Sequence, residues 1–308
     1  VITQSFNFIA TVEAIVDTGA SVIFTDIDDT LNMSPKSLES LITKKTKAII
    51  PVHMLGVPAD MISINRIGKR FKIPIIEDAC EAIGAKVAKK YVGGLSEFGV
   101  FSFDFGKMIT TGEGGALFSK KKNDGKIARM YHDHGHKNIP DLPRGLDRAG
   151  LIGFNYRMTE ISGAFGKVQL GKFSGILKDS EKRYLTLERY ISHNQIKLRH
   201  VNLGNEPNYD TFVISIENKK LRKRVISLLN QTGFGTKNLP DAFNWHCAYF
   251  WEHINKKIRN KEVTNCYHRL LKCVAIPILV SRPIIDLSLI HISEPTRRYA
   301  ISYAVFCL

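Results

Sequence analysis

The sequence has few cysteines, and they form no recognisable framework. Among its 308 residues there are five cysteines, and none belongs to a matched pair of CxxC motifs. This odd, scattered set argues against a disulfide scaffold and against a zinc site, so we expect no bound metal. The five are Cys80, Cys247, Cys266, Cys273 and Cys307.

Long apolar runs are also lacking. The longest ones, such as Cys273–Val280, have the length of a strand and are far too short to span a membrane. No basic stretch followed by an apolar stretch opens the chain, so we expect no export signal and a cytoplasmic protein. The first residue is Val1, inside a strand-like run, and we therefore expect further native residues upstream.

The charge balance is strongly basic, with 44 Lys and Arg against 29 Asp and Glu and a net charge of +15. Such a balance is typical either of a nucleic-acid binder or of a lysine-rich solvated surface that meets an anionic substrate. The basic residues are spread along the chain, and no helix-turn-helix, zinc-finger or RNP signature accompanies them. The pattern favours the second interpretation, with neither nucleic acid nor membrane as a partner.

The first half alternates apolar, β-branched runs with helix-like segments. One helix is predicted to begin at Ser34-Pro35, with serine as N-cap and proline in the first turn. Another follows Pro58, because Met61, Ile64, Ile67 and Phe71 recur at helical spacing. This alternation predicts an α/β fold with a mostly parallel sheet, whose ligand lies beyond the carboxyl ends of the strands. The predicted strands are Ser21–Thr25, Ala48–Val52, Ile73–Ile76, Val100–Phe103 and Gly115–Phe118.

The character of the sequence changes near residue 172. A charged helical stretch then leads to a strand near Asp210–Ile216 and a helix near Leu221–Leu229. We expect a large domain over residues 1–172 and a smaller α+β domain over residues 173–286. Residues 287–308 do not fit either unit, and we interpret them as a non-native tail.

Two polar groups follow predicted core strands. Asp78 ends the strand Ile73–Ile76, and Lys107 follows Val100–Phe103 in an apolar, glycine-rich stretch. A lysine held in such surroundings is suited to covalent chemistry with a carbonyl, and a carboxylate can hold a proton on a cofactor ring. Taken singly, each residue has an ordinary structural explanation, Lys107 as a loop residue and Asp78 as a helix cap.

Four motifs in order make the pattern specific. They are IIEDACEAIGA, FSFDFGKMITTGEGGA, DHGH and GFNYRMTEISGAFGKVQL. Together they resemble the DegT/DnrJ/StrS family of sugar aminotransferases, with matching stretches from Val1 to about Trp251. The resemblance implies an aspartate-aminotransferase-like (fold type I) large domain and pyridoxal 5′-phosphate as the cofactor.

The same resemblance implies a role for single residues. Lys107 corresponds to the lysine that binds the cofactor covalently, and Asp78 to the partner of the pyridine nitrogen. Ser102 is similar to the serine that contacts the phosphate, and Phe8 to the aromatic residue that stacks on the ring. Asn155 corresponds to an asparagine that reaches the neighbouring subunit's cofactor, which implies a homodimer with shared active sites.

Some positions depart from the family pattern or are less specific. Glu81 stands where the family usually has Gln or His beside the cofactor hydroxyl. The family's Ser-Gly-Thr-Ala phosphate loop would precede the matched region. His53, His134 and His136 are candidates for substrate contact, although a histidine in a turn is as often a cap or hydrogen-bonding residue.

The expected activity is transfer of an amino group from glutamate to a keto-sugar. The runs TVEAIVDTGAS and WHCAYFWEH are similar to a branch of the family that aminates a keto-octulosonate for lipopolysaccharide, whereas most members aminate nucleotide-linked keto-hexoses. The alternatives are the family's sugar dehydratases, which replace the lysine by histidine, and a non-catalytic protein of the same fold.

Overall fold

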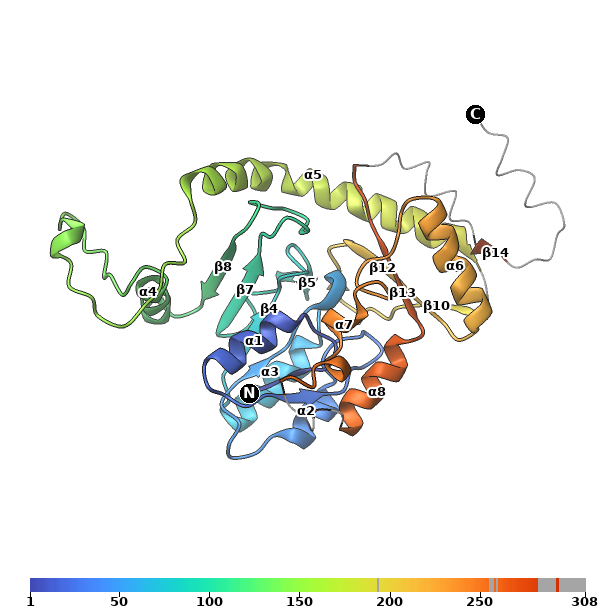
Figure 1. Cartoon of the computed structure of the whole chain (residues 1–308), viewed down its shortest axis with the longest axis horizontal. Coiled ribbons are helices and arrows are strands. Elements are labelled where there is room, and N and C mark those ends of the chain that lie inside the picture. The colour runs from blue at the N-terminus through green and yellow to red at the C-terminus, as the bar shows by residue number, and fades with distance from the viewer. Residues whose placement is uncertain (193, 255–257, 259, 282–291, 294–308) are drawn as a thin grey trace.

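The computed structural model describes residues 1–308 except 193, 255–257, 259, 282–291 and 294–308. Strands alternate with helices as far as Asp78, and the next four strands follow without the helix expected before Val100–Phe103. A long helix crosses the top of the molecule, and a second group of strands lies under its far end (Figure 1). Apart from Ile292–Ser293, the expected non-native tail lies outside the described residues.

The main sheet has the order β2-β1-β3-β4-β7-β8. All of its pairings are parallel except that of β7 with β8, and single bridges join β3 to β4. The five predicted strands are therefore confirmed, and a short strand at the N-terminus joins them. The bounds are β1 Ile2–Gln4, β2 Ile23–Thr25, β3 Ile49–Ile50, β4 Ile76–Asp78, β7 Phe98–Ser102 and β8 Gly115–Ser119.

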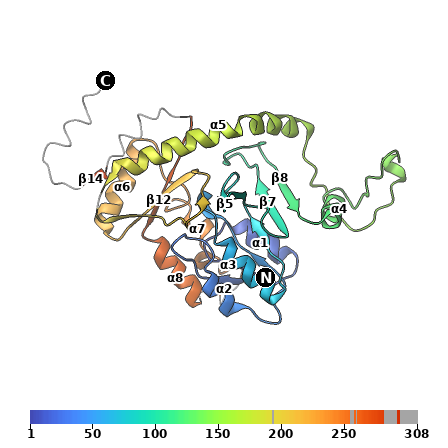
Figure 2. The same ribbon diagram turned by 180° about the vertical axis from the view of Figure 1, so that it is seen from behind.

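Helices α1 (Ile9–Asp17), α2 (Pro35–Leu41) and α3 (Met61–Phe71) pack beside this sheet (Figures 1 and 2). Ser34 caps α2 by accepting a hydrogen bond from the backbone of Ser37, and Pro35 occupies the first turn, as predicted. The α3 stripe of Met61, Ile64 and Ile67 is buried against the sheet. Burial of each such side chain contributes roughly 1.5–3 kcal/mol, which fixes α3 on the sheet.

The second half is built around α5 (Glu160–Tyr190), a helix of 31 residues. The antiparallel sheet β10-β12-β13 and helix α6 (Lys219–Gln231) pack near its C-terminal end. The strands are β10 Ile196–Leu198, β12 Thr211–Ile216 and β13 Cys273–Pro277. The expected boundary between residues 172 and 173 falls inside α5, so one helix spans both halves, and the division into domains stays a prediction.

The end of the second half returns to the first. Helices α7 (Phe243–His246) and α8 (Lys261–Leu270), with the turn η3 (Ala248–Phe250), lie beside α1 and β2. Trp251 and Val263 are buried in one cluster with Val12 and Phe24. The two halves therefore share apolar cores, which their separation in the sequence does not indicate.

The segment between α4 (Lys122–Tyr131) and α5 projects away from the rest of the molecule as an arm, here residues 132–159 (Figures 1 and 2). It contains only one short turn, η2 (Arg144–Leu146). The remaining short elements are η1 Met54–Gly56, β5 Lys86–Val87, β6 Lys90–Tyr91, β9 Ile191–Ser192, β11 Asn205–Glu206 and β14 Ile292–Ser293.

Candidate active site

Asp78 is the last residue of β4, at the carboxyl end of the parallel strands, and its side chain is buried with 6% exposed. The hydroxyl of Thr11 donates a hydrogen bond to Asp78 Oδ2 at 2.6 Å, and the backbone N–H of Cys80 donates to Oδ1 at 3.1 Å. The Cys80 thiol forms a third hydrogen bond with this carboxylate. A carboxylate has about four acceptor positions, so Asp78 can accept a further hydrogen bond.

The neighbouring strand β7 ends at Ser102 and leads to Lys107. Asp104 shapes the intervening turn, because its carboxylate accepts from the N–H of Gly106 at 2.7 Å and its carbonyl accepts from the N–H of Lys107 at 3.1 Å. The Ser102 hydroxyl accepts a hydrogen bond from the N–H of Asp104 at 3.3 Å. Since β4 and β7 are adjacent and parallel, both strand ends open on the same edge of the sheet, as predicted.

A narrow pocket at this edge brings the two halves of the chain together. Lys107 lines it beside the loop that follows Asp78, and three polar residues of the second half line the other side. Lys237 forms an ion pair with Asp210 there. The lining residues are Cys80, Glu81, Ile83, Lys107, Met108, Asn208, Asp210 and Lys237.

Glu81 is held in this pocket as an anion. Its carboxylate accepts hydrogen bonds from the N–H of Leu55 at 2.9 Å and from the Asn238 side chain at 3.1 Å. Burial would raise the pKa of Glu81, but the charges of Lys107, Lys237 and His246 and the hydrogen bond from Leu55 together outweigh burial and lower the pKa to about 2. The departure from the family pattern at this position is thus accompanied by two lysines that neutralise the added charge.

Phe8 is the N-cap residue of α1, and 44% of its side chain is exposed. Its ring lies 5.2 Å from that of His246, centroid to centroid. His246 donates from Nδ1 to the carbonyl of Ala242 at 2.8 Å, and burial lowers the pKa of its ring. The open face of Phe8 is available to stack on a flat ligand.

Asn155 lies on the arm and is exposed. The base of the arm is held by Asp133, which pairs with the backbone of Asn155 and accepts hydrogen bonds from Arg144 at 3.0 Å and Arg157 at 2.7 Å. The hydrogen bonds from Arg144, followed by that from Arg157, lower the pKa of Asp133 well below its usual range. Asn155 therefore lies next to the bonded base of a projecting segment, outside the residues that line the pocket around Lys107.

The three histidines are not brought together. His134 and His136 lie on the arm, His134 exposed and His136 with Nδ1 3.8 Å from Asp147. His53 is fully buried, accepts a hydrogen bond from the N–H of Ala59 at 3.0 Å and faces the Glu77 carboxylate at 3.3 Å. Both ring nitrogens of His53 are therefore engaged inside the core, and this placement indicates a structural part rather than the substrate contact we expected.

Glu77 explains why His53 is held there. Burial would raise the pKa of the Glu77 carboxyl, but the hydrogen bond from His53 and the backbone N–H groups of Gly93 and Ser96 lower it. The buried carboxylate therefore needs these three donors, and His53 Nε2 carries the proton that satisfies it.

Sequence reasoning missed Thr11, Asn208, Lys237 and Asn238. Each makes its contact across a large sequence separation, such as the 157 residues between Asn238 and Glu81. Asn238 has a left-handed backbone with φ 65°. Asparagine tolerates this conformation better than most residues, so the residue type itself was the one local signal for a turn at this position.

The residues at the strand ends fit pyridoxal 5′-phosphate by their chemistry. Lys107 supplies an amine, Asp78 supplies a carboxylate with a free acceptor position, and Ser102 supplies a hydroxyl. Phe8 adds an exposed aromatic face. These are the four kinds of group that the cofactor's aldehyde, ring nitrogen, phosphate and ring require.

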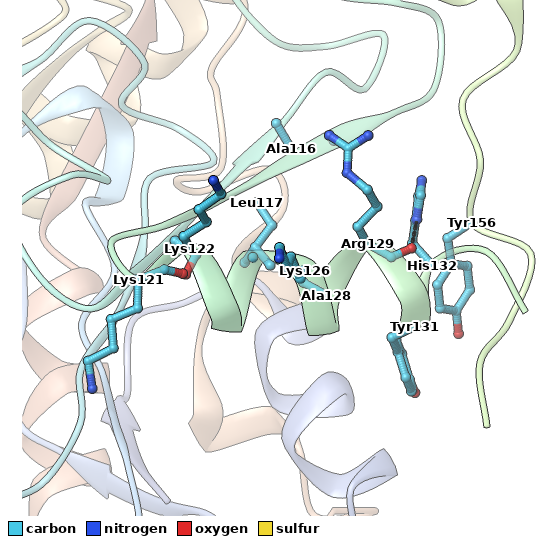
Figure 3. A pocket seen from close by; sticks show the side chains of 13 residues that line it. Ala116, Leu117, Lys121, Lys122, Lys126, Ala128, Arg129, Tyr131, His132 and Tyr156 are labelled. Atoms are coloured by element: carbon cyan, nitrogen blue, oxygen red, sulfur yellow. Dashed lines mark hydrogen bonds between the residues drawn. The ribbon is translucent and has the colours of Figure 1, made fainter. Parts of the chain in front are cut away.

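A larger cavity, of about 850 Å³, lies elsewhere, between β8 and α4 (Figure 3). Its basic side chains point in several directions and do not converge on one point (Figure 3). None of the described residues that line it is a candidate for cofactor binding, so we assign no chemistry to it. The basic residues are Lys121, Lys122, Lys126 and Arg129.

Within the part of the chain that the structure describes, no group of three or more His, Cys, Asp or Glu side chains is arranged to hold a metal ion. Among the helices described there, α5 included, none combines the length and the apolar character needed to cross a membrane.

Two curated proteins are similar to this chain over part of its length. GDP-perosamine synthase of Escherichia coli O157:H7 is 42% identical over 171 residues, which are 55% of this chain and 46% of that protein. The enzyme of the same name from Caulobacter vibrioides is 36% identical over 206 residues, which are 66% of this chain and 54% of that protein. This chain thus matches about half the length of these curated relatives.

A solved structure supports the fold. A sugar aminotransferase from Micromonospora echinospora is 21% identical and superimposes with a TM-score of 0.82 over 94% of this chain and 78% of the other. The expected α/β, aspartate-aminotransferase-like (fold type I) architecture is confirmed. The sequence profile of the DegT/DnrJ/EryC1/StrS aminotransferase family matches residues 1–281, and the chain belongs to that family.

Proposed function

We propose that this chain forms the core of a pyridoxal-phosphate-dependent sugar aminotransferase. The observation that carries the proposal is the placement of Asp78 and Lys107. They follow adjacent parallel strands, and Lys107 lines one pocket with the loop that begins at Asp78. A protein that used this fold only as a scaffold would need neither group at that edge.

Each residue has a defined part in the proposed reaction. Lys107 holds the cofactor and, once its amine is released, moves a proton between the donor Cα and the cofactor C4′. Asp78 keeps the ring nitrogen protonated, Ser102 binds the phosphate, and Phe8 covers one face of the ring. The bound cofactor supplies an electron sink that stabilises negative charge at the substrate carbon.

Glutamate is the proposed amino donor and a keto-sugar the acceptor. The names of the two curated relatives, both GDP-perosamine synthases, support a nucleotide-linked keto-hexose. The runs near Thr11 and His246 support a keto-octulosonate for lipopolysaccharide instead. Both acceptors are anionic, which suits the net charge of +15.

The test is an amino-transfer assay on the protein that contains this chain, loaded with cofactor. Formation of 2-oxoglutarate from glutamate, together with an amino-sugar product identified by mass spectrometry, supports the proposal and selects the acceptor. Lys107→Ala should abolish the visible absorption band of the lysine-bound cofactor. A band that persists in that variant would remove Lys107 from its proposed role, and water loss without amine transfer would favour a dehydratase.

We also propose a cytoplasmic homodimer whose subunits share their active sites. The support is the arm, which carries Asn155 and leaves several large apolar side chains exposed. Surfaces of this kind are typical of protein interfaces. The exposed side chains include Ile152, Phe154, Tyr156 and, at the start of α5, Ile161 and Phe165.

A further inference from the structure

Thr11 makes a contact that its sequence position does not suggest. It lies in the first turn of α1, and its hydroxyl donates a hydrogen bond of 2.6 Å to Asp78 Oδ2, 67 residues away. An O–H donor at this distance from a carboxylate forms a short, charge-assisted hydrogen bond. Asp78 is 94% buried, so little water reaches it to replace this donor.

The other donor to Asp78 is part of the chain itself. The N–H of Cys80 binds Oδ1 at 3.1 Å, and because it belongs to the backbone it is present whatever side chain stands at position 80. The Cys80 thiol also forms a hydrogen bond with Asp78, but a thiol is a weak donor. Thr11 therefore supplies the strong side-chain hydrogen bond to Asp78, and together with the Cys80 N–H it defines the orientation of the carboxylate plane.

Helix α1 links this donor to a second group at the site. Phe8 is the N-cap of α1, and Thr11 follows three residues later, almost one helical turn on. Phe8 itself has an extended backbone, with φ −88° and ψ 140°. The N-terminal end of α1 thus carries both the aromatic residue proposed to cover the cofactor ring and the hydroxyl that holds the carboxylate proposed to meet the ring nitrogen.

We propose that Thr11 is a positioning residue, which acts through Asp78 to keep a proton on the cofactor's ring nitrogen; this inference rests on the proposed function. Without the Thr11 hydroxyl, Oδ2 would lose its partner in a buried site. The carboxylate would then turn more freely and take up a proton more readily itself. The shared proton would move from the ring nitrogen toward Asp78, which weakens the electron sink.

The test compares Thr11→Val, which keeps the volume and removes the donor, with Thr11→Ser, which keeps the donor. For Thr11→Val we expect about tenfold weaker binding of pyridoxal 5′-phosphate to the cofactor-free protein, since a hydrogen bond to a charged group is lost. The pH at which the ring nitrogen of the bound cofactor loses its proton, followed by the absorption of the cofactor, should move downward. We expect kcat to fall about tenfold while both KM values stay within about twofold, because Thr11 touches neither substrate. Thr11→Ser should restore all of these quantities.

The matched control is Thr18→Val at the other end of α1, where the hydroxyl donates only to the carbonyl of Ile15. It should behave as the wild type. In an Asp78→Asn background, Thr11→Val should have no further effect on kcat or on the pH profile, because a residue that acts through Asp78 cannot act without it. If Thr11→Val does not fold, Thr11→Ala and the Asp78→Asn background provide the same comparison.

A Thr11→Val protein with wild-type cofactor affinity, kcat and pH profile would overturn the inference. So would a Thr11→Ser protein as impaired as Thr11→Val, since packing rather than the hydroxyl would then be responsible. A wild-type protein that forms no Lys107-dependent band would overturn the proposed function and this inference together. A normal wild-type band with an unaffected Thr11→Val protein would overturn the inference alone.

Discussion

Asp78 is the residue on which the proposed chemistry depends most directly. Asp78→Asn should keep the fold, because an amide has nearly the same shape, but it cannot hold a positive charge on the ring nitrogen. We expect both half-reactions to slow by a factor on the order of a hundred or more, measured by single-turnover spectroscopy. Asp26→Asn, at the end of β2, is the matched control and should leave both rates unchanged. Near-normal half-reactions in Asp78→Asn would remove Asp78 from the site.

The lowered pKa of Glu81 predicts that the stability of the fold depends on pH. Its pKa in the folded chain is about 2, below the ordinary value of 4.5, because nearby positive charges, Lys107 foremost, and a backbone hydrogen bond together outweigh the effect of burial. A lowered pKa stabilises the fold above pH 4.5, and this contribution is lost as the pH falls from 4.5 toward 2. Urea unfolding of the cofactor-free protein should therefore show that Glu81→Gln loses less stability over this range, by on the order of 1–3 kcal/mol. Glu39→Gln, at an exposed position, should follow the wild type.

At the scale of elements, the loop after β4 is held by a side chain of the second half. Asn208, 1% exposed, donates to the carbonyls of Glu81 at 3.1 Å and Ile83 at 3.2 Å. Asn208→Ala leaves these carbonyls without a partner, and we expect the free energy of unfolding to fall by about 2–3 kcal/mol. Cofactor affinity should fall as well, because the loop carries Glu81. Equilibrium denaturation measures the first effect and titration the second.

Asn265 is exposed, and its side chain donates a hydrogen bond to Asp26 at 3.2 Å, away from the loop. Asn265→Ala is therefore the control for Asn208→Ala. It should change the free energy of unfolding by less than about 0.5 kcal/mol. An Asn208→Ala protein as stable as the wild type would mean that the second half does not support the loop.

At the scale of the whole molecule, shared sites predict complementation between inactive subunits. Lys107→Ala and Asn155→Ala should each be impaired as pure dimers. If Lys107 and Asn155 of a site come from different subunits, a mixed dimer has one site with both defects and one site with neither. Mixing the two variants should therefore restore activity, measured against each variant alone. No recovery in verified mixed dimers would show that Asn155 serves its own subunit.

The sequence by itself determined the places of five core strands, the N-cap of α2 and the two strand-end residues Asp78 and Lys107. These depend on local spacing and on the rule that parallel strands end at one edge, so neighbouring residues carry the information. Only the tertiary structure decided which distant residues meet there. Asn238 reaches Glu81, Thr11 reaches Asp78, and His53 turns into the core, because long-range packing selects among contacts that no local pattern distinguishes.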